Sequence, residues 1–255
     1  MRLIGLLAVL LIVGLGATSQ PAGLTTSSSV DQILDALHDR GRDLADFSAL
    51  VKLSDENNAT GDATVSSGKL LFQSKPGGDA RIRIAFDKKQ LGDKIFEQNH
   101  TYTLDGGWLV ERDYDKRQEV RREVLKPGEK LDLFRLGKGP FPLPIGQKKE
   151  DVENIFDVVK VDADKDDPAG SVHLRLTPKA GTQYAHDFSS VDVWVDLRLD
   201  MPVRIETLDA NQTTVKTTDF SDVKLNQGLS DKDFEEAPLP SGWDQVSEPF
   251  DQQGG

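Results

Sequence analysis

The sequence predicts an α+β protein with one large, curved antiparallel β-sheet whose apolar face is covered by a few helices. Three observations support this fold class. Eight segments between residues 69 and 220 alternate apolar and polar side chains with a period of two, as strands with one buried face do. Turn residues, mainly Gly, Pro and Asp, separate these segments. One segment near the N-terminus instead has the spacing of an amphipathic helix.

The alternation assigns side chains to the two faces of the predicted sheet. Ile82, Ile84 and Phe86 fall on one face, and Arg81 and Arg83 fall on the other. A later segment alternates in the same way between valines and polar residues. The sheet is therefore expected to meander with one apolar face, over the segments 69–75, 81–87, 107–113, 118–124, 171–178, 190–197, 201–208 and 213–220.

An amphipathic helix is predicted over residues 30–46. Ser29 and Gln32 have the spacing of a capping box, in which each side chain caps the backbone of the other residue. Gly41 is expected to weaken the middle of the helix. The apolar stripe, which should pack on the sheet, contains Val30, Ile33, Leu34, Leu37, Leu44 and Phe47.

An insertion interrupts the sheet between residues 124 and 171. Short helices are predicted over 127–137 and 148–156, joined by the loop "GKGPFPLPIGQ". Its prolines exclude a helix or a central strand. Two interpretations remain for its apolar side chains: a semi-rigid rim with flexible glycine ends at the mouth of a cavity, or a plug at the edge of the sheet. The cavity itself is expected because a few short helices cannot fill the space on the concave side of a curved sheet.

The first residues are typical of an export signal. A basic start precedes the apolar run 3–16, and the small residues Ala17 and Ser19 suit a cleavage site after Ser19. The run is shorter than the ~20 residues that span a bilayer. We expect a signal peptide over 1–19, a flexible linker over 20–29, one domain over 30–245, a disordered tail over 246–255 and a periplasmic location.

Composition excludes several classes of function. A formal net charge of −12 and a pI near 4.8 argue against nucleic acid, whose phosphates would be repelled. The chain has no cysteine, which excludes disulfides, thiolate metal sites and a cysteine nucleophile. We expect no metal and no cofactor, because the four histidines lack paired spacing. The acidic segment 162–170 departs from a calcium loop and is better explained as a solvated turn.

No catalytic motif stands out. The chain lacks G-x-S-x-G, the phosphate-binding G-x-x-x-x-G-K-[ST] and H-E-x-x-H. His186, Asp187, Ser189 and Ser190 are neighbours in sequence, but a catalytic triad depends on convergence in space. We therefore expect a protein that is not an enzyme.

Four segments resemble a known family. "SGKLLFQSKPGGDARIRIAFD" (67–87), "NHTYTLDGGWLVERDYDKRQ" (99–118), "LRLTPKA" (174–180) and "DFEEAPLPSGW" (233–243) are similar to motifs of the periplasmic lipoprotein-sorting carriers (LolA-like). The resemblance spans roughly residues 30–243 and implies a half-open β-barrel, covered by helices, that shields the acyl chains of lipoproteins. It also implies membrane donor and acceptor proteins as partners, and we expect a monomer.

The resemblance also implies functional residues. In the bacterial carriers, an arginine before a strand-loop proline ties the sheet to the lid. Here the proline is Pro76, and Lys75 stands in place of the arginine. A lysine keeps the charge but lacks the planar bidentate fork. The residues expected to line the cavity or its mouth are Leu34, Leu37, Phe72, Ile82, Ile84, Phe86, Phe96, Trp108, Phe134, Phe141, Leu143 and Ile145.

Two functions fit these expectations. One is a soluble carrier that binds acyl chains of lipoproteins or other lipids reversibly and carries them toward the outer membrane. The other is an envelope sensor of the same fold that detects lipoprotein or glycolipid and signals by contact.

Overall fold

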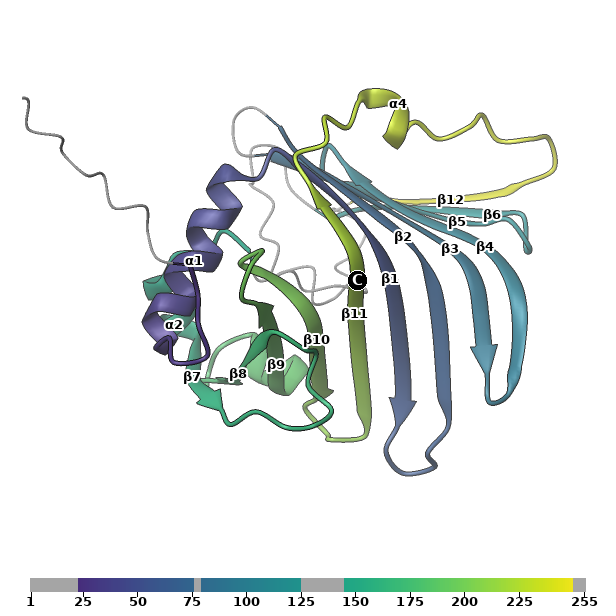
Figure 1. Ribbon diagram of the computed structural model, residues 1–255. Helices are drawn as coiled ribbons and strands as arrows, with labels where there is room; N and C mark the ends of the chain where they lie inside the picture. Colours follow the sequence, from purple (N-terminus) through teal and green to yellow (C-terminus); the bar gives the residue numbers. More distant parts are fainter. Residues whose placement is uncertain (1–22, 76–78, 125–144, 250–255) are drawn as a thin grey trace, which may run out of the picture.

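In the computed structural model, which describes residues 23–75, 79–124 and 145–249, twelve strands form one strongly curved sheet (Figure 1). The strand order is β12-β6-β5-β4-β3-β2-β1-β11-β10-β9-β8-β7. Neighbouring described strands pair antiparallel, except that β12 runs parallel to β6. The predicted fold class, an α+β protein on one large antiparallel sheet, is confirmed. The strands are β1 (Asp46–Asn57), β2 (Ala63–Lys75), β3 (Asp79–Leu91), β4 (Lys94–Asp105), β5 (Trp108–Asp113), β6 (Gln118–Glu123), β7 (Phe156–Val161), β8 (Ser171–Pro178), β9 (Phe188–Asp196), β10 (Met201–Asp209), β11 (Thr214–Leu225) and β12 (Asp244–Glu248).

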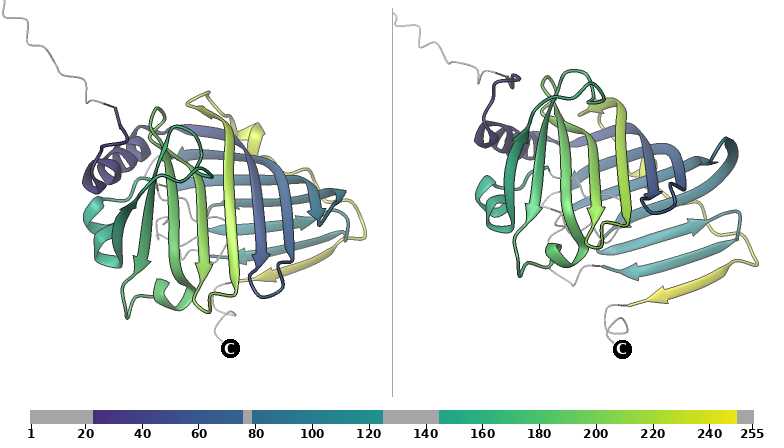
Figure 2. Two further views of the ribbon diagram at one scale, coloured as in Figure 1. Left: turned by 60° about the horizontal axis from the view of Figure 1, so that its bottom comes forward. Right: turned by 90° about the horizontal axis from the view of Figure 1, so that it is seen from below.

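Two helices cover part of the concave face of the sheet, α1 (Val30–Asp43) and α2 (Lys149–Ile155). Both lie beside β7 to β9 on the inner side of the curve (Figures 1 and 2). The predicted capping box is present: Ser29 Oγ accepts from the Gln32 N–H at 3.2 Å, and Gln32 Oε1 accepts from the Ser29 N–H at 2.9 Å. Two one-turn helices, α3 (Tyr184–Asp187) and α4 (Asp231–Phe234), lie outside this layer.

The predicted helix over 30–46 ends too late. The helix stops at Asp43, Leu44 is already extended, and the next residues form β1 at the centre of the sheet. The residues after Asp43 continue the apolar spacing of the helix by coincidence. From Phe47 onward they also alternate apolar and polar side chains, as a strand does. Pairing with β2 and β11 decides between the two patterns. Strands β4, β7 and β12 were also absent from the predicted set of strands.

The C-terminal segment crosses the convex face before it becomes an edge strand (Figure 1). It begins at the buried carboxylate of Asp46, which accepts hydrogen bonds from the N–H groups of Gln227, Gly228 and Leu229 at 2.8 to 3.2 Å. Phe234 is buried beneath the guanidinium of Arg81, whose Cζ lies 4.2 Å from the ring centre. This face of the sheet is therefore covered by the chain's own C-terminal residues.

Further along this segment, Glu236 joins two strands of the sheet. Its Oε2 lies 3.2 Å from the guanidinium of Arg112, which also donates to Glu119 at 2.8 Å. Its Oε1 lies 3.3 Å from Nε of Arg83. The two arginines stand on neighbouring parts of the convex face, so one carboxylate bridges them and holds the segment down.

Two predicted boundaries differ from the structure. The predicted tail begins at residue 246, but Val246 to Glu248 pair with β6, so the folded region runs further. The predicted flexible linker ends at residue 29, yet Ser28 is buried and its N–H donates to Thr25 O at 3.0 Å. Lys160 of β7 donates to Ser28 O at 3.1 Å. Residues 25–29 are thus attached to the edge of the sheet, and the predicted signal peptide lies outside the described residues.

Candidate functional site

The concave face carries a continuous apolar surface. Paired residues of β1, β2 and β3 put Phe47, Phe72 and Ile82 side by side, and the first two rings stack with centres 5.3 Å apart. Two rows further along β2, a Cβ on Gly68 would lie 1.9 Å from Ala85 O, so only glycine fits this position. The glycine of the quoted motif 67–87 therefore permits the bend of β2 against β3 that curves the sheet here.

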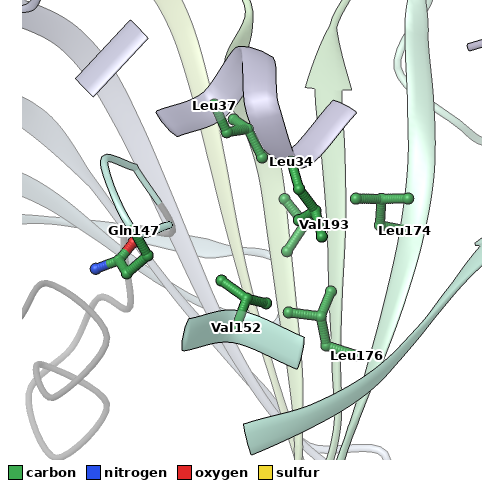
Figure 3. A pocket seen from close by; sticks show the side chains of 7 residues that line it. All are labelled: Leu34, Leu37, Gln147, Val152, Leu174, Leu176 and Val193. Atoms are coloured by element: carbon green, nitrogen blue, oxygen red, sulfur yellow. The ribbon is translucent and has the colours of Figure 1, made fainter. Parts of the chain in front are cut away.

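Helices α1 and α2 close over the other half of this surface. Side chains of α1, α2, β8 and β9 converge there from four directions (Figure 3). They leave a void of only about 10 Å³, the space of about one water molecule at most. The described part of the interior is thus closed and packed here by its own side chains. The void is lined by Leu34, Leu37, Gln147, Val152, Leu174, Leu176 and Val193.

Polar contacts at the rim attach α1 to its surroundings. Arg40 Nε donates to Leu199 O at 2.7 Å, and its terminal nitrogen lies 3.6 Å from the Asp200 carboxylate. His38 Nδ1 lies 3.0 Å from Gly146 O, and the Gly146 N–H donates to Leu37 O at 3.2 Å. The helix is therefore tied to the β9–β10 turn on one side and to the segment before α2 on the other.

Most predicted site residues within the described part come together. Ile145 is 4 % exposed and belongs to the same core, which at this position favours the plug interpretation of the proline loop. Gly146 is held against α1 rather than serving as an unattached hinge. Phe134, Phe141, Leu143 and Pro76 lie outside the described residues. The residues that meet in one buried core are Leu34, Leu37, Phe72, Ile82, Ile84, Phe86 and Ile145.

Two predicted site residues do not join this core. Trp108 pairs with Asp105 while the next residue, Leu109, pairs with buried Leu104, so Trp108 faces the convex side, with Arg121 5.7 Å from its ring centre. The Gly106–Gly107 turn sets this register, which the sequence pattern alone leaves open. Phe96 is 47 % exposed near the tip of the β3–β4 hairpin, beyond the reach of the packed core.

None of the residues predicted to line the cavity comes from β1 or from β8 to β10. Yet Phe47, Val51, Leu174, Val193 and Ile205 are all at most 2 % exposed and belong to the core. The alternating valines of 190–197 carry the signal that could have identified part of this group. The pairing of β9 with β8 and β10 then extends that apolar face across the sheet.

Lys75 pairs with a residue of the sheet itself. Its ammonium contacts the Asp105 carboxylate, which links the end of β2 to the end of β4. Both side chains are about a third exposed, so the pair contributes little to stability, about 0–1 kcal/mol. The predicted role of Lys75 in tethering a lid stays a prediction, because the segment that follows lies outside the described residues.

A polar network occupies the part of the concave face beyond the apolar core. Glu111 of β5 accepts from Tyr102 at 3.3 Å, contacts His100 Nε2 at 3.0 Å, and pairs with Arg122 at 3.1 Å. Hydrogen bonding from His100, followed by that from Arg122, lowers the pKa of Glu111 to about 2 despite partial burial. Burial and the nearby Glu111 raise the pKa of Tyr102. The concave face therefore has an apolar part and a charged part.

A groove of about 710 Å³ opens beside the apolar void. It lies between the end of α1, the segment before α2, α2 itself, the start of β7 and α3. Gln147 and Val152 line both the groove and the void. The groove is lined by His38, Gly146, Gln147, Lys148, Asp151, Val152, Asn154, Ile155, Phe156 and Tyr184.

Metal-binding clusters and membrane-spanning helices are both absent from the described residues. These contain no group of three His, Cys, Asp or Glu side chains placed to hold a metal ion. The acidic segment 162–170 forms the connection between β7 and β8, where Asp167 accepts from Trp194 Nε1 at 2.6 Å. Among the described helices, none combines the length and the hydropathy needed to cross a membrane.

Comparison with known proteins gives structural matches. The sequence matches no protein-family model and no curated protein. An uncharacterized conserved protein from Thermus thermophilus is 14 % identical, with 85 % of this chain and 97 % of that chain covered and a TM-score of 0.47. The MucA/MucB complex of Pseudomonas aeruginosa gives 13 % identity, coverage of 81 % and 60 %, and a TM-score of 0.44.

A LolA superfamily protein from Nitrosomonas europaea is also similar. It is 15 % identical, with 82 % of this chain and 99 % of that chain covered and a TM-score of 0.36. The chain is thus similar in structure to a protein of the LolA superfamily, at low sequence identity.

Proposed function

We propose that this protein is a periplasmic carrier, without enzymatic activity, that shields the acyl chains of lipoproteins or other lipids between its helices and the concave face of its sheet. One observation carries the proposal: a continuous apolar surface is covered by two short helices, of which α1 is attached at its rim by a few polar contacts. Such a surface can exchange its own helix side chains for a lipid chain. The sequence motifs that resemble the lipoprotein-sorting carriers support the same class of ligand.

Opening is a necessary step. The void of about 10 Å³ beneath α1 and α2 cannot take an acyl chain, so at least one helix must move away from the sheet. Movement of α1 exposes Leu34 and Leu37, and exposing each side chain costs about 1.5–3 kcal/mol of hydrophobic free energy. An entering chain offsets this cost, since each methylene that it buries contributes about 0.8 kcal/mol. Binding is therefore favourable once several methylenes replace the helix side chains.

Native mass spectrometry of protein from the periplasmic fraction tests the proposal. We expect co-purified lipid, or lipoprotein, on the wild-type protein and its loss in Leu37→Gln, which places an amide in the apolar lining. Leu50→Gln is the control, because Leu50 is 52 % exposed and its strand register puts it on the convex face. Melting curves establish that each variant is folded. Absence of lipid from wild-type protein, together with no binding of added fatty acid, would reject the proposal.

A transfer assay separates the carrier from the sensor. A carrier should deliver its bound chain to acceptor vesicles or to an acceptor membrane protein, with release accelerated by the acceptor. A sensor should keep its lipid and instead gain affinity for a protein partner when lipid is bound. Fluorescent fatty acid loaded on the protein, mixed with vesicles and followed by its emission, measures the first behaviour directly.

A further inference from the structure

The groove beside the apolar void differs from it in both size and chemistry. At about 710 Å³ it falls within the roughly 300–1,000 Å³ of small-molecule sites, whereas the void is nearly closed. Its floor contains two aromatic rings, Phe156 and Tyr184, with centres 5.3 Å apart. Polar side chains from α1, the segment before α2, and α2 form its walls.

The groove and the void share a wall. Gln147 and Val152 line both, and Figure 3 shows Gln147 as the polar member of an otherwise aliphatic lining. A molecule with an apolar tail in the interior would therefore place its polar end in the groove. Both spaces are bounded by α1 and α2, so a movement of either helix that opens the void also widens the connection.

The charges of the groove favour a neutral head group. Its formal charges are one ammonium, of Lys148, and one carboxylate, of Asp151, which cancel. Gln147 and Asn154 add amides that donate and accept hydrogen bonds. An anionic head group would meet the carboxylate, and a cationic one would meet the ammonium. A hydroxyl group can instead donate to the carboxylate and accept from the ammonium and the amides.

We propose that the groove binds a neutral, hydroxyl-bearing head group of an amphipathic lipid whose chain occupies the adjacent interior. This inference rests on the proposed function, since it requires that the interior takes a lipid chain. It adds a subsite that recognises the polar end of the same ligand, and it assigns Asn154 and Gln147 as residues that contact it.

Three probes with one chain length test the inference: a monoacylglycerol, the corresponding lysophosphatidic acid and the fatty acid methyl ester. Affinities are measured by displacement of an apolar fluorescent dye. Asn154→Leu should weaken the monoacylglycerol about fivefold to tenfold, the loss expected for one hydrogen bond, and leave the methyl ester unchanged. Glu150→Leu is the control, because it makes a similar apolar change on α2 outside the groove.

The outcomes separate the two proposals. Equal losses for the monoacylglycerol and the methyl ester, or none for either, would overturn the head-group subsite while leaving the lipid carrier intact. A lysophosphatidic acid that binds more than tenfold tighter than the monoacylglycerol, with that gain lost in Lys148→Gln, would overturn the neutral head group. Failure of all three probes to bind folded wild-type protein would overturn the proposed function and, with it, this inference.

Discussion

Gly41 of α1 and Gly146 of the segment before α2 touch backbone to backbone. A Cβ added to Gly41 would lie 2.3 Å from the Gly146 Cα and 2.5 Å from its nitrogen. Gly146 has a φ of +88°, a conformation that glycine adopts without strain. The two glycines therefore allow the close approach that joins α1 to the segment before α2, and this contact offsets the low helix propensity of Gly41.

Gly41→Ala should weaken the attachment of α1. In an exposed helix this change stabilises by about 1 kcal/mol, but here the new methyl group meets backbone atoms that cannot move aside cheaply. We expect a net loss of about 1–3 kcal/mol, as for overpacking, and faster uptake of an apolar dye. Denaturant titration and dye-binding kinetics measure the two effects.

Gly23→Ala provides the matched control for this change. A Cβ at Gly23 meets nothing within 4 Å, so stability and dye uptake should both stay near the wild-type values. A Gly41→Ala protein that is more stable than wild type would show that the close approach does not constrain α1.

Asp200→Asn should stabilise the protein at neutral pH. Burial, partly opposed by Arg40, raises the pKa of the Asp200 carboxyl, so the folded protein holds this proton more tightly than the unfolded chain. Stability from this group is therefore lost as the pH rises through the raised pKa. Asparagine carries no charge and tolerates the φ of +52° at this position. Melting temperatures should favour the variant at pH 7 and converge below the ordinary value of 3.8.

Asp39→Asn is the control for Asp200→Asn. Asp39 is 62 % exposed and pairs with Arg42 on the surface of the same helix that Arg40 belongs to. Its substitution should change stability by less than about 0.5 kcal/mol at either pH. An Asp200→Asn protein that melts lower than wild type at pH 7 would show that the Arg40 ion pair outweighs the burial of the carboxylate.

Glu111→Gln should destabilise the protein. Its effect should depend on pH in the sense opposite to that of the Asp200 carboxyl, because the pKa of Glu111 is lowered rather than raised. The pKa of Glu111 is lowered from 4.5 to about 2 by its bonds to His100 and Arg122. The carboxylate therefore contributes stability above pH 4.5 that is lost as the pH falls toward 2. We expect the free energy of unfolding to fall by about 2 kcal/mol at pH 7, as measured by urea titration. This difference should shrink as the pH falls from 4.5 toward 2.

The exposed Glu97 of β4 offers the comparison for Glu111. Glu97→Gln removes a carboxylate from the strand next to β5 without breaking the network, so it should leave the urea midpoint nearly unchanged. A constant difference between Glu111→Gln and wild type from pH 7 to pH 2 would contradict the lowered pKa of Glu111.

Phe234→Ala should separate stability from lipid binding. The side chain is 5 % exposed on the convex face, beneath Arg81 and away from the apolar interior. Its loss should cost about 3–5 kcal/mol and lower the melting temperature, while the folded fraction keeps wild-type affinity for an acyl probe. A loss of affinity in the folded protein would show that the C-terminal segment is coupled to the concave face.

The sequence by itself determined the local features of this protein. The predicted strand over 171–178 has the same bounds as β8, and the faces of Ile82, Ile84 and Phe86 are confirmed by their burial. The capping box at Ser29 is also present as predicted. Each of these depends on residues within a few positions of one another, where periodicity and backbone hydrogen bonding leave little choice.

Only the tertiary structure decided the features that join distant segments. Helical and strand spacing both fit the residues after Leu44 until pairing with β2 and β11 selected a strand. The Gly106–Gly107 turn placed Trp108 on the convex face, although its size and apolar character suit a cavity equally well. Gly41 weakens a helix in isolation, but against Gly146 it is the residue that fits. Local propensity differs by only about 1 kcal/mol between such alternatives, so contacts between segments far apart in the chain determine the outcome.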